Sequence, residues 1–291
     1  MKPSGSLAKT DWVLGSANLG MKYGIANDSK PTRNQSKKII TEAIRNGVIK
    51  FDTAPAYGEA EEILGESLQY LASAKVITKI SGNQQDNFEA IVESLRSSLE
   101  KTKQKKLYGL LFHNPEIVKS QHFRSLVRRL LDTGLVEKLG VSGYTEVDIL
   151  RAKEKCDELS LFQVPENILD RRLMGSDGLQ AIACAGGEIH VRSIFLQGLL
   201  LMDPHTFHAT LRPWEQAIID LNKLASSLGV TVIDLCISYV KSLKWSSGTL
   251  IAASSTSSLL AIIQGNCTVK YDLSHLPKLP DKLVDPRRWN E

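Results

Sequence analysis

The sequence of 291 residues contains only four cysteines, and no two of them form a CxxC pair. The four residues stand far apart in the chain: Cys156, Cys184, Cys236 and Cys267. This spacing argues against a disulfide framework and against a zinc site made of thiolates. We therefore expect a reducing compartment and a cytoplasmic protein. His205 and His208 have HxxH spacing, but no carboxylate or thiol near them in the sequence completes a set of metal ligands, so no metal site is predicted.

Long apolar runs and blocks of one charge are also missing. The first 12 residues lack the apolar segment of a signal peptide, and the longest apolar run, 193–202, is interrupted by Gln197 and Gly198. A membrane-spanning helix needs about 20 apolar residues. The 36 basic and 32 acidic residues are interspersed, with a net charge of +4. Neither a membrane nor a nucleic acid is therefore indicated as a partner, and we expect a small-molecule ligand.

The chain alternates between short apolar segments and longer segments with helical periodicity, and 42% of its residues are hydrophobic, which excludes a disordered chain. The pattern predicts strands at 12–17, 48–53, 75–80, 107–113, 137–142, 161–164, 188–195 and 249–253. It predicts helices at 33–46, 61–71, 87–101, 123–133, 147–156, 179–185, 214–228, 232–242 and 259–265.

Eight such units in this length are typical of a (β/α)₈ barrel, with residues 1–291 forming one domain. A doubly wound open sheet is the structural alternative. That fold would need a G-x-G-x-x-G turn after the first strand to hold a dinucleotide, and the turn GSANLGMKYG does not supply it. A phosphate-binding isomerase barrel would need a glycine-rich turn after strand seven or eight, where the chain offers only Gly198.

In a barrel, the chemistry takes place at the C-terminal ends of the strands. Four titratable residues are predicted there: Asp52 ends the second strand, Tyr57 follows it, Lys79 ends the third and His113 the fourth. Each alone has a structural interpretation, as a turn cap, a rim residue, a solvated strand end or a core histidine. Together they supply the ingredients of proton transfer on three adjacent strands.

The four residues have complementary chemistry. A tyrosine with its usual pKa near 10 donates a proton poorly at neutral pH unless a nearby cation stabilises its anion. Lys79 can be that cation, Asp52 would hold it, and His113 could hydrogen-bond a substrate oxygen. Tyr57 would then protonate a carbonyl oxygen. None of these groups can deliver a hydride, so a nicotinamide cofactor must be supplied.

The segment FDTAPAYGEAEEILGESL, at 51–68, resembles the aldo-keto reductase family, in which Asp and Tyr precede a G-x-x-E-x-x-x-G pattern at this spacing. Lys79 and His113 complete the family's tetrad in order, and LVEKLGVSGY at 135–144 is similar to its strand-five signature. The resemblance extends over nearly the whole chain. It implies a (β/α)₈ enzyme that binds NADPH or NADH across the barrel mouth and reduces an aldehyde or ketone to an alcohol.

The resemblance also implies a set of cofactor contacts. Ser142 and Gln163 would bind the nicotinamide carboxamide, and Gln197, Gly198 and Leu199 would lie in the loop under the pyrophosphate. Ser254, Ser255 and Ser258 match the segment that binds the adenosine and its phosphate. Arg192 completes the set, at the position of the aromatic residue that stacks on the nicotinamide.

Besides Arg192, which replaces the stacking aromatic residue, two further departures from the family pattern concern the cofactor. Gly143 replaces the usual Asn after the strand-five serine, so one carboxamide contact is missing or is supplied by another group. No Arg or Lys lies between Lys244 and Lys270, where the 2′-phosphate of NADPH would be bound. We therefore expect NADPH as cofactor with weak discrimination against NADH.

The segments NLGMKYGIAND and RSIFLQGLLL resemble a bacterial branch linked with sugar and cell-surface polysaccharide metabolism, which implies a sugar-derived carbonyl substrate. Basic residues of the mouth loops could contact an anionic group of that substrate: Lys22, Arg171, Arg172 and Arg192. The alternative for Arg171 and Arg172 is a structural pairing with Asp170 or Glu166. The alternative function is a nucleotide-binding regulatory protein with little turnover, like the potassium-channel β subunits. The sequence leaves the oligomeric state open.

Overall fold

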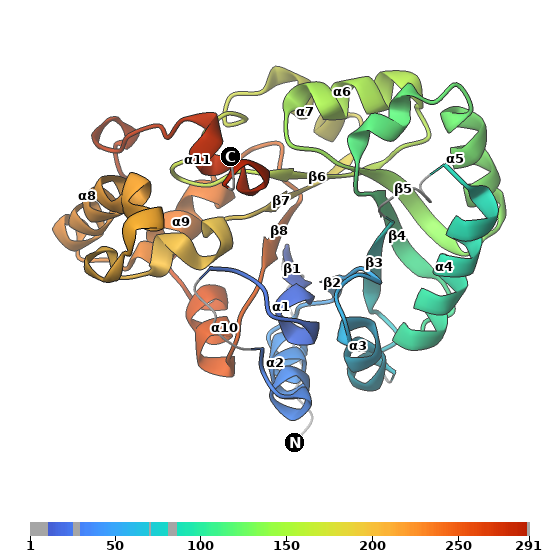
Figure 1. Cartoon of the computed structure of the whole chain (residues 1–291), viewed down its shortest axis with the longest axis horizontal. Coiled ribbons are helices and arrows are strands. Elements are labelled where there is room, and N and C mark those ends of the chain that lie inside the picture. Colours follow the sequence, from blue (N-terminus) through green and yellow to red (C-terminus); the bar gives the residue numbers. More distant parts are fainter. Residues whose placement is uncertain (1–10, 26–29, 70, 81–85, 290–291) are drawn as a thin grey trace.

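The computed structural model describes residues 11–25, 30–69, 71–80 and 86–289, and its strands close into a parallel barrel in the order β1 to β8. Figure 1 shows the helices arranged around the outside of this barrel. The strands are β1 (Trp12–Gly15), β2 (Lys50–Asp52), β3 (Lys75–Ile80), β4 (Leu107–Phe112), β5 (Val136–Ser142), β6 (Leu161–Pro165), β7 (Glu188–Arg192) and β8 (Gly248–Ile251). Pairing of β1 with both β2 and β8 closes the sheet. The predicted (β/α)₈ fold is thus confirmed.

The described helices have bounds close to the predicted ones wherever apolar periodicity is strong. They are α1 (Ala17–Gly20), α2 (Arg33–Arg45), α3 (Ala60–Leu68), α4 (Phe88–Thr102), α5 (Phe123–Asp132), α6 (Glu146–Lys155), α7 (Asp177–Cys184), α8 (Arg212–Leu228), α9 (Val232–Lys241), α10 (Thr256–Ile263) and α11 (Asp281–Val284). In α2, Thr32 and Gln35 form a capping box, and Ile39, Ile40 and Ala43 are buried on one face. α2 therefore covers the barrel with one apolar stripe.

Among the boundaries that differ from the prediction, two have clear local reasons. β7 ends at Arg192 and not at residue 195, because Ser193 has a φ of 60° and turns the chain out of the sheet. α10 starts at Thr256 and not at residue 259, because Ser255 caps the helix in a box with Ser258. Both corrections lie at the C-terminal end of the barrel.

The opposite, N-terminal end of the barrel is closed by a charged cluster. Glu188, the first residue of β7, accepts hydrogen bonds from Lys50, from Lys138 at 2.8 Å and from Tyr108 at 2.5 Å, and it also contacts His190. These partners hold the pKa of Glu188 far below its usual value in spite of burial. A carboxylate with this many partners at the N-terminal face serves stability.

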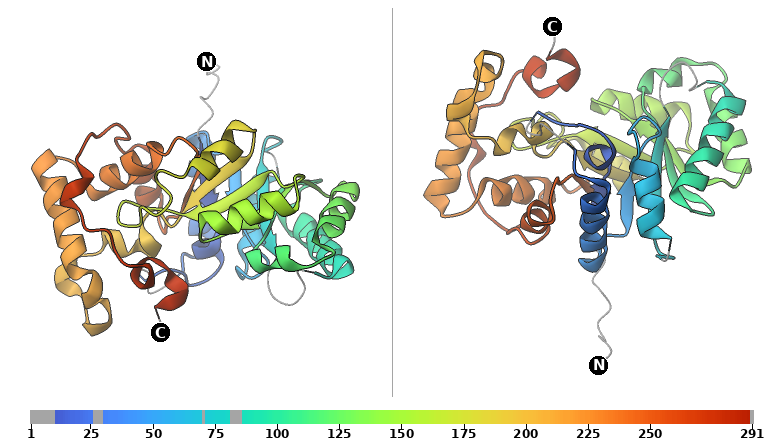
Figure 2. Two further views of the ribbon diagram at one scale, coloured as in Figure 1. Left: turned by 90° about the horizontal axis from the view of Figure 1, so that it is seen from above. Right: turned by 60° about the horizontal axis from the view of Figure 1, so that its bottom comes forward.

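The C-terminal segment packs beside α8, as both views in Figure 2 show. Trp214 donates a hydrogen bond to the Leu283 carbonyl at 2.9 Å, and its ring lies 5.4 Å from that of Trp289.

In the described residues no single helix is long and apolar enough to cross a membrane. Only the pair Ala209–Leu228 and Val232–Lys241, taken together, has the length and apolar composition of a span, and it is bent by 93°.

Candidate active site

A cavity of about 290 Å³ opens at the C-terminal ends of the strands. Asp52, Tyr57, Lys79 and His113 all line it, so the structure brings the four predicted residues together. Asp52 is the last residue of β2, Lys79 lies near the end of β3 and His113 directly follows β4. The positions agree with the rule that barrel chemistry sits at this face.

Close packing fixes the loop that carries Tyr57. Gly58 has a φ of 60°, and a Cβ on Gly20 of α1 would lie 2.1 Å from the Tyr57 carbonyl oxygen, so α1 packs directly on this loop. Glu61 of α3 is buried and accepts hydrogen bonds from Thr78 at 3.1 Å and Ser98 at 2.8 Å. The G-x-x-E pattern therefore anchors α3 and, with it, the position of Tyr57.

Lys79 and Asp52 form a buried ion pair, with exposed fractions of 5% and 2%. Gln163 Nε2 donates to the second oxygen of Asp52 at 2.8 Å. Burial by itself would lower the pKa of Lys79, but the Asp52 carboxylate and then Tyr57 outweigh it, and the pKa lies above its usual value. Lys79 therefore stays protonated at physiological pH.

The ammonium of Lys79 faces Tyr57. Its Nζ lies 5.4 Å from the centre of the Tyr57 ring. His113 is exposed at the cavity rim, yet desolvation by the surrounding protein and the charges of Lys79 and Arg192 lower the pKa of its imidazole. A neutral imidazole is therefore available to hydrogen-bond a ligand oxygen in the cavity.

Most of the residues predicted to contact the cofactor also line the cavity: Ser142, Gln163, Arg192, Gln197, Gly198, Ser254 and Ser258. Leu199 does not, because its side chain is fully buried in the hydrophobic core. Ser255 contributes as the N-cap of α10, where its side chain accepts the Ser258 N–H at 3.0 Å. The predicted loops therefore meet at one mouth, but not through every side chain.

The cavity wall holds unpaired polar atoms that fit a nicotinamide carboxamide. Gln163 Oε1 and Asn18 Oδ1 are buried and have no hydrogen-bond partner among the described residues. A carboxamide can donate to such oxygens and accept from the Ser142 hydroxyl. Ser254 and Ser258, at the N-terminus of α10, also line the cavity and suit a phosphate group. These side chains therefore fit the cofactor implied by the sequence.

The departure at Gly143 has a steric cause. A Cβ at this position would lie 2.9 Å from both Asp148 Cβ and Ile149 Cδ1, so α6 leaves no room for an asparagine. The Gly143 carbonyl instead accepts a hydrogen bond from Arg192 at 3.1 Å.

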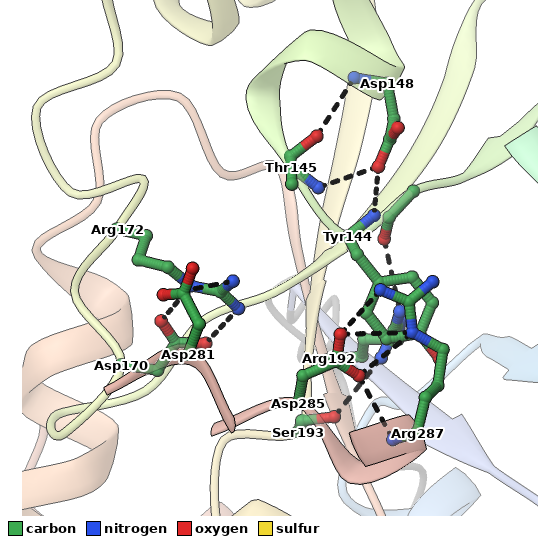
Figure 3. Close-up of polar contacts among 11 residues, drawn as sticks. Tyr144, Thr145, Asp148, Asp170, Arg172, Arg192, Ser193, Asp281, Asp285 and Arg287 are labelled. Carbon is green, nitrogen blue, oxygen red and sulfur yellow. Dashed lines mark hydrogen bonds and ion pairs between the residues drawn. The ribbon is translucent and has the colours of Figure 1, made fainter. Parts of the chain in front are cut away.

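Sequence reasoning missed Asn18, Tyr23 and Tyr144, which also line the cavity. Asn18 and Tyr144 follow β1 and β5 closely, so the strand-end rule could have found both. Figure 3 shows Tyr144 with Arg192 and with Arg287 from the C-terminal segment. The two guanidinium carbons lie 4.3 Å and 3.4 Å from the centre of its ring.

The other basic residues of the mouth loops have structural partners or are exposed. Arg172 makes two hydrogen bonds to Asp170, at 2.7 and 2.9 Å, and Arg171 binds the carbonyls of Ile168 and Leu276. Arg172 thus has the predicted structural partner, whereas Arg171 is held by backbone carbonyls and not by Asp170 or Glu166. Lys22 is exposed.

Across the described residues no group of three or more His, Cys, Asp or Glu side chains could hold a metal ion.

Glu166 directly follows β6, the strand that carries Gln163 of the cavity wall. It is fully buried, accepts from Tyr239 at 2.5 Å and from the Leu173 N–H at 3.0 Å, and so ties the end of the Gln163 strand to α9. Burial, with a contribution from Asp170, raises its pKa from the usual 4.5 to about 8 against the opposing effect of the Tyr239 hydrogen bond.

This shift predicts a pH-dependent stability. Between pH 4.5 and about 8 the folded protein keeps a proton on Glu166 that the unfolded chain has released, so the free energy of unfolding falls as pH rises. In Glu166→Gln, the amide can accept from Leu173 and donate to the Tyr239 oxygen without titrating, and we expect a shallower decline. Urea denaturation at several pH values measures the difference. Parallel curves for the two proteins would contradict the shift.

The fold and the cavity thus define a (β/α)₈ barrel whose mouth carries an acid, a phenol, an amine and an imidazole. A family model described as the Aldo/keto reductase family matches residues 12–275, and the chain belongs to this family. Its members are oxidoreductases that generally use NAD(P)H and act on small carbonyl compounds, so the chain is an NAD(P)H-dependent oxidoreductase in this general sense.

Solved structures support the same fold. The chain is similar to the glycerol dehydrogenase AKR11B4 from Gluconobacter oxydans, with a TM-score of 0.69, 19% identity, and coverage of 94% of this chain and 91% of the other. It is also similar to the thermostable aldo-keto reductase Tm1743 solved with the inhibitor epalrestat, with a TM-score of 0.70, 19% identity, and coverage of 95% and 94%. Among curated proteins, none matches the chain significantly.

Proposed function

We propose that the protein reduces an aldehyde or ketone to an alcohol with NADPH, and that Tyr57 is the general acid. The observation that supports this most directly is the buried Lys79–Asp52 ion pair beside the Tyr57 ring at the end of a cavity. When bound, the cofactor supplies the hydride. The protein's own side chains supply the proton and the geometry.

In this mechanism the proton moves from the Tyr57 hydroxyl to the substrate oxygen. The resulting phenolate is stabilised by Lys79, which Asp52 holds in place and keeps charged. His113 hydrogen-bonds the same substrate oxygen and orients the carbonyl. In the reverse reaction Tyr57 acts as the base.

The cofactor would be held by the residues that meet at the mouth. Ser142 and Gln163 would bind the carboxamide, since the free Gln163 oxygen suits its amide hydrogens. Gln197, Gly198, Ser254, Ser255 and Ser258 would surround the phosphates and the adenosine, with Ser255 acting through the α10 N-terminus. The resemblance to a bacterial sugar-associated branch supports a sugar-derived carbonyl as substrate.

A fluorescence titration with NADPH and NADH, followed by a screen of aldehydes and ketones, tests the proposal. We expect binding of a reduced nucleotide and its oxidation by at least one carbonyl compound. If neither nucleotide binds at millimolar concentration, the proposal is wrong.

The altered mouth favours one other function. Gly143 lacks the family's carboxamide contact and Arg192 replaces its stacking aromatic residue, which suits a protein that binds the nucleotide and senses or signals with little turnover. Tight nucleotide binding without turnover on any carbonyl would favour this alternative.

The residues at α10 predict weak cofactor discrimination. The Ser255 and Ser258 hydroxyls lie 2.9 Å apart and offer neutral hydrogen bonds of about 0.5 to 1.5 kcal/mol, against about 1.5 to 3 for charged ones. We therefore expect both nucleotides to bind, with NADPH preferred by less than about 100-fold, or about 2.7 kcal/mol. Dissociation constants measured by nucleotide fluorescence check this.

A preference of about 10,000-fold would contradict the expectation and would require a cation from outside this segment. Lys37 and Lys38 of α2 are the nearby candidates for that cation, since they line a groove together with Thr256 of α10.

A further inference from the structure

Arg192 ends β7, is half-buried and lines the same cavity as Tyr57, Lys79 and His113. Three contacts hold it in place. It donates to the Gly143 carbonyl at 3.1 Å and to the Ser193 hydroxyl at 3.4 Å, and its guanidinium lies against the ring of Tyr144. The side chain is therefore positioned before any ligand binds.

The charge of Arg192 is not neutralised. Within the part of the chain that the structure describes, no carboxylate lies within 4.0 Å of its guanidinium, and its hydrogen bonds to Gly143 and Ser193 use two of its five N–H donors. The other charges near it are balanced, since Asp52 pairs with Lys79 and Asp285 pairs with Arg287. The cavity therefore carries one uncompensated positive charge.

The Arg287 guanidinium makes the contrast clear. It contacts the same Tyr144 ring, but it binds Asp285 through Nε and Nη2, at 2.9 and 2.5 Å, and it is not among the residues that line the cavity. Figure 3 shows this pair beside Arg192. The two guanidinium groups contact one ring, but only that of Arg192 has no carboxylate partner among the described residues and also lines the cavity. An unpaired charge at a cavity is what binding an anion requires.

We propose that Arg192 is a specificity residue that binds an anionic oxygen group, a carboxylate or a phosphate, on the carbonyl substrate. This inference rests on the proposed reductase function and narrows its substrate class to acidic aldehydes or ketones. A planar guanidinium with free donors matches both groups in charge and geometry. The diphosphate of the cofactor is the other source of such oxygens, and affinity for the cofactor separates the two.

Two matched substrate pairs test the proposal: 4-oxobutanoate against its methyl ester, and D-glyceraldehyde 3-phosphate against D-glyceraldehyde. We expect the wild-type enzyme to favour the charged member of at least one pair in kcat/KM. Arg192→Met should reduce that preference by about 10- to 100-fold, because a charge-assisted hydrogen bond is lost. Arg192→Lys should retain most of the preference, and in both variants the dissociation constant of NADPH should change far less than the substrate preference does in Arg192→Met.

Arg287→Met is the matched control, since it removes a guanidinium from the same ring without removing a free charge from the cavity. Its substrate preference should equal that of the wild type. The proposal is overturned if the wild type treats both members of both pairs alike, if Arg192→Met keeps the preference, or if the variant loses NADPH affinity and the preference stays.

A binding measurement keeps this proposal separate from the reductase function. Calorimetric titration of succinate and of neutral succinamide needs no turnover, and we expect only succinate to bind, with weaker affinity in Arg192→Met. Failure to bind any nucleotide would refute the reductase function. Equal succinate binding by wild type and variant would refute the anion site.

Discussion

Tyr57→Phe should abolish carbonyl reduction while NADPH still binds. The substitution removes the phenolic hydroxyl and leaves the ring that faces Lys79 in place. General acid catalysis contributes about 100- to 10,000-fold, so kcat should fall by at least this amount. Steady-state kinetics with the best carbonyl of the screen, and a fluorescence titration of the same sample, measure the two quantities.

A turnover within about threefold of the wild type would remove Tyr57 from the role of acid. Tyr144→Phe is a matched control, because Tyr144 also lines the cavity but donates no proton in the proposed mechanism. Its kcat should therefore fall far less than that of Tyr57→Phe. Lys79→Met should add little to Tyr57→Phe in the double variant, since residues of one proton-transfer unit are coupled. Additive losses would mean that Lys79 acts in a separate step.

The barrel could be predicted because its signals are local. Each βα unit shows its strand and its helix in apolar periodicity, and the eight units imply closure. The misplaced boundaries depend on backbone detail that periodicity does not carry. Ser193, Leu196 and Gln197 all have positive φ values, which ends β7 early, and no pattern of apolar residues indicates this.

The convergence of Asp52, Tyr57, Lys79 and His113 on one cavity could also be predicted, because strand ends in a barrel converge. The environment of Arg192 could not. It depends on Tyr144 after β5 and on Arg287 near the C-terminus, which meet only through the packing of the C-terminal segment on α8 and on the loop after β6. Contacts between residues so far apart in sequence leave no periodic signal.

The Lys79–Asp52 pair predicts the largest effect on stability. Lys79→Met leaves the Asp52 carboxylate buried with Gln163 as its remaining partner, and breaking a buried pair in this way costs about 3 to 5 kcal/mol. Urea denaturation should show this loss in the free energy of unfolding. In contrast, Lys119→Met breaks the exposed pair with Glu116 and should change stability by less than about 0.5 kcal/mol.

The double variant Lys79→Met/Asp52→Asn separates stability from catalysis. Neutralising both partners removes the uncompensated charge, so most of the lost stability should return, because a buried ion pair replaced by neutral groups of similar size is often no less stable. Turnover should not return, since no cation remains beside Tyr57 to stabilise its anion. Recovery of turnover together with stability would show that the pair acts only by holding the barrel together. A Lys79→Met variant as stable as the wild type would contradict the expected loss and would show that the ion pair does not stabilise the fold.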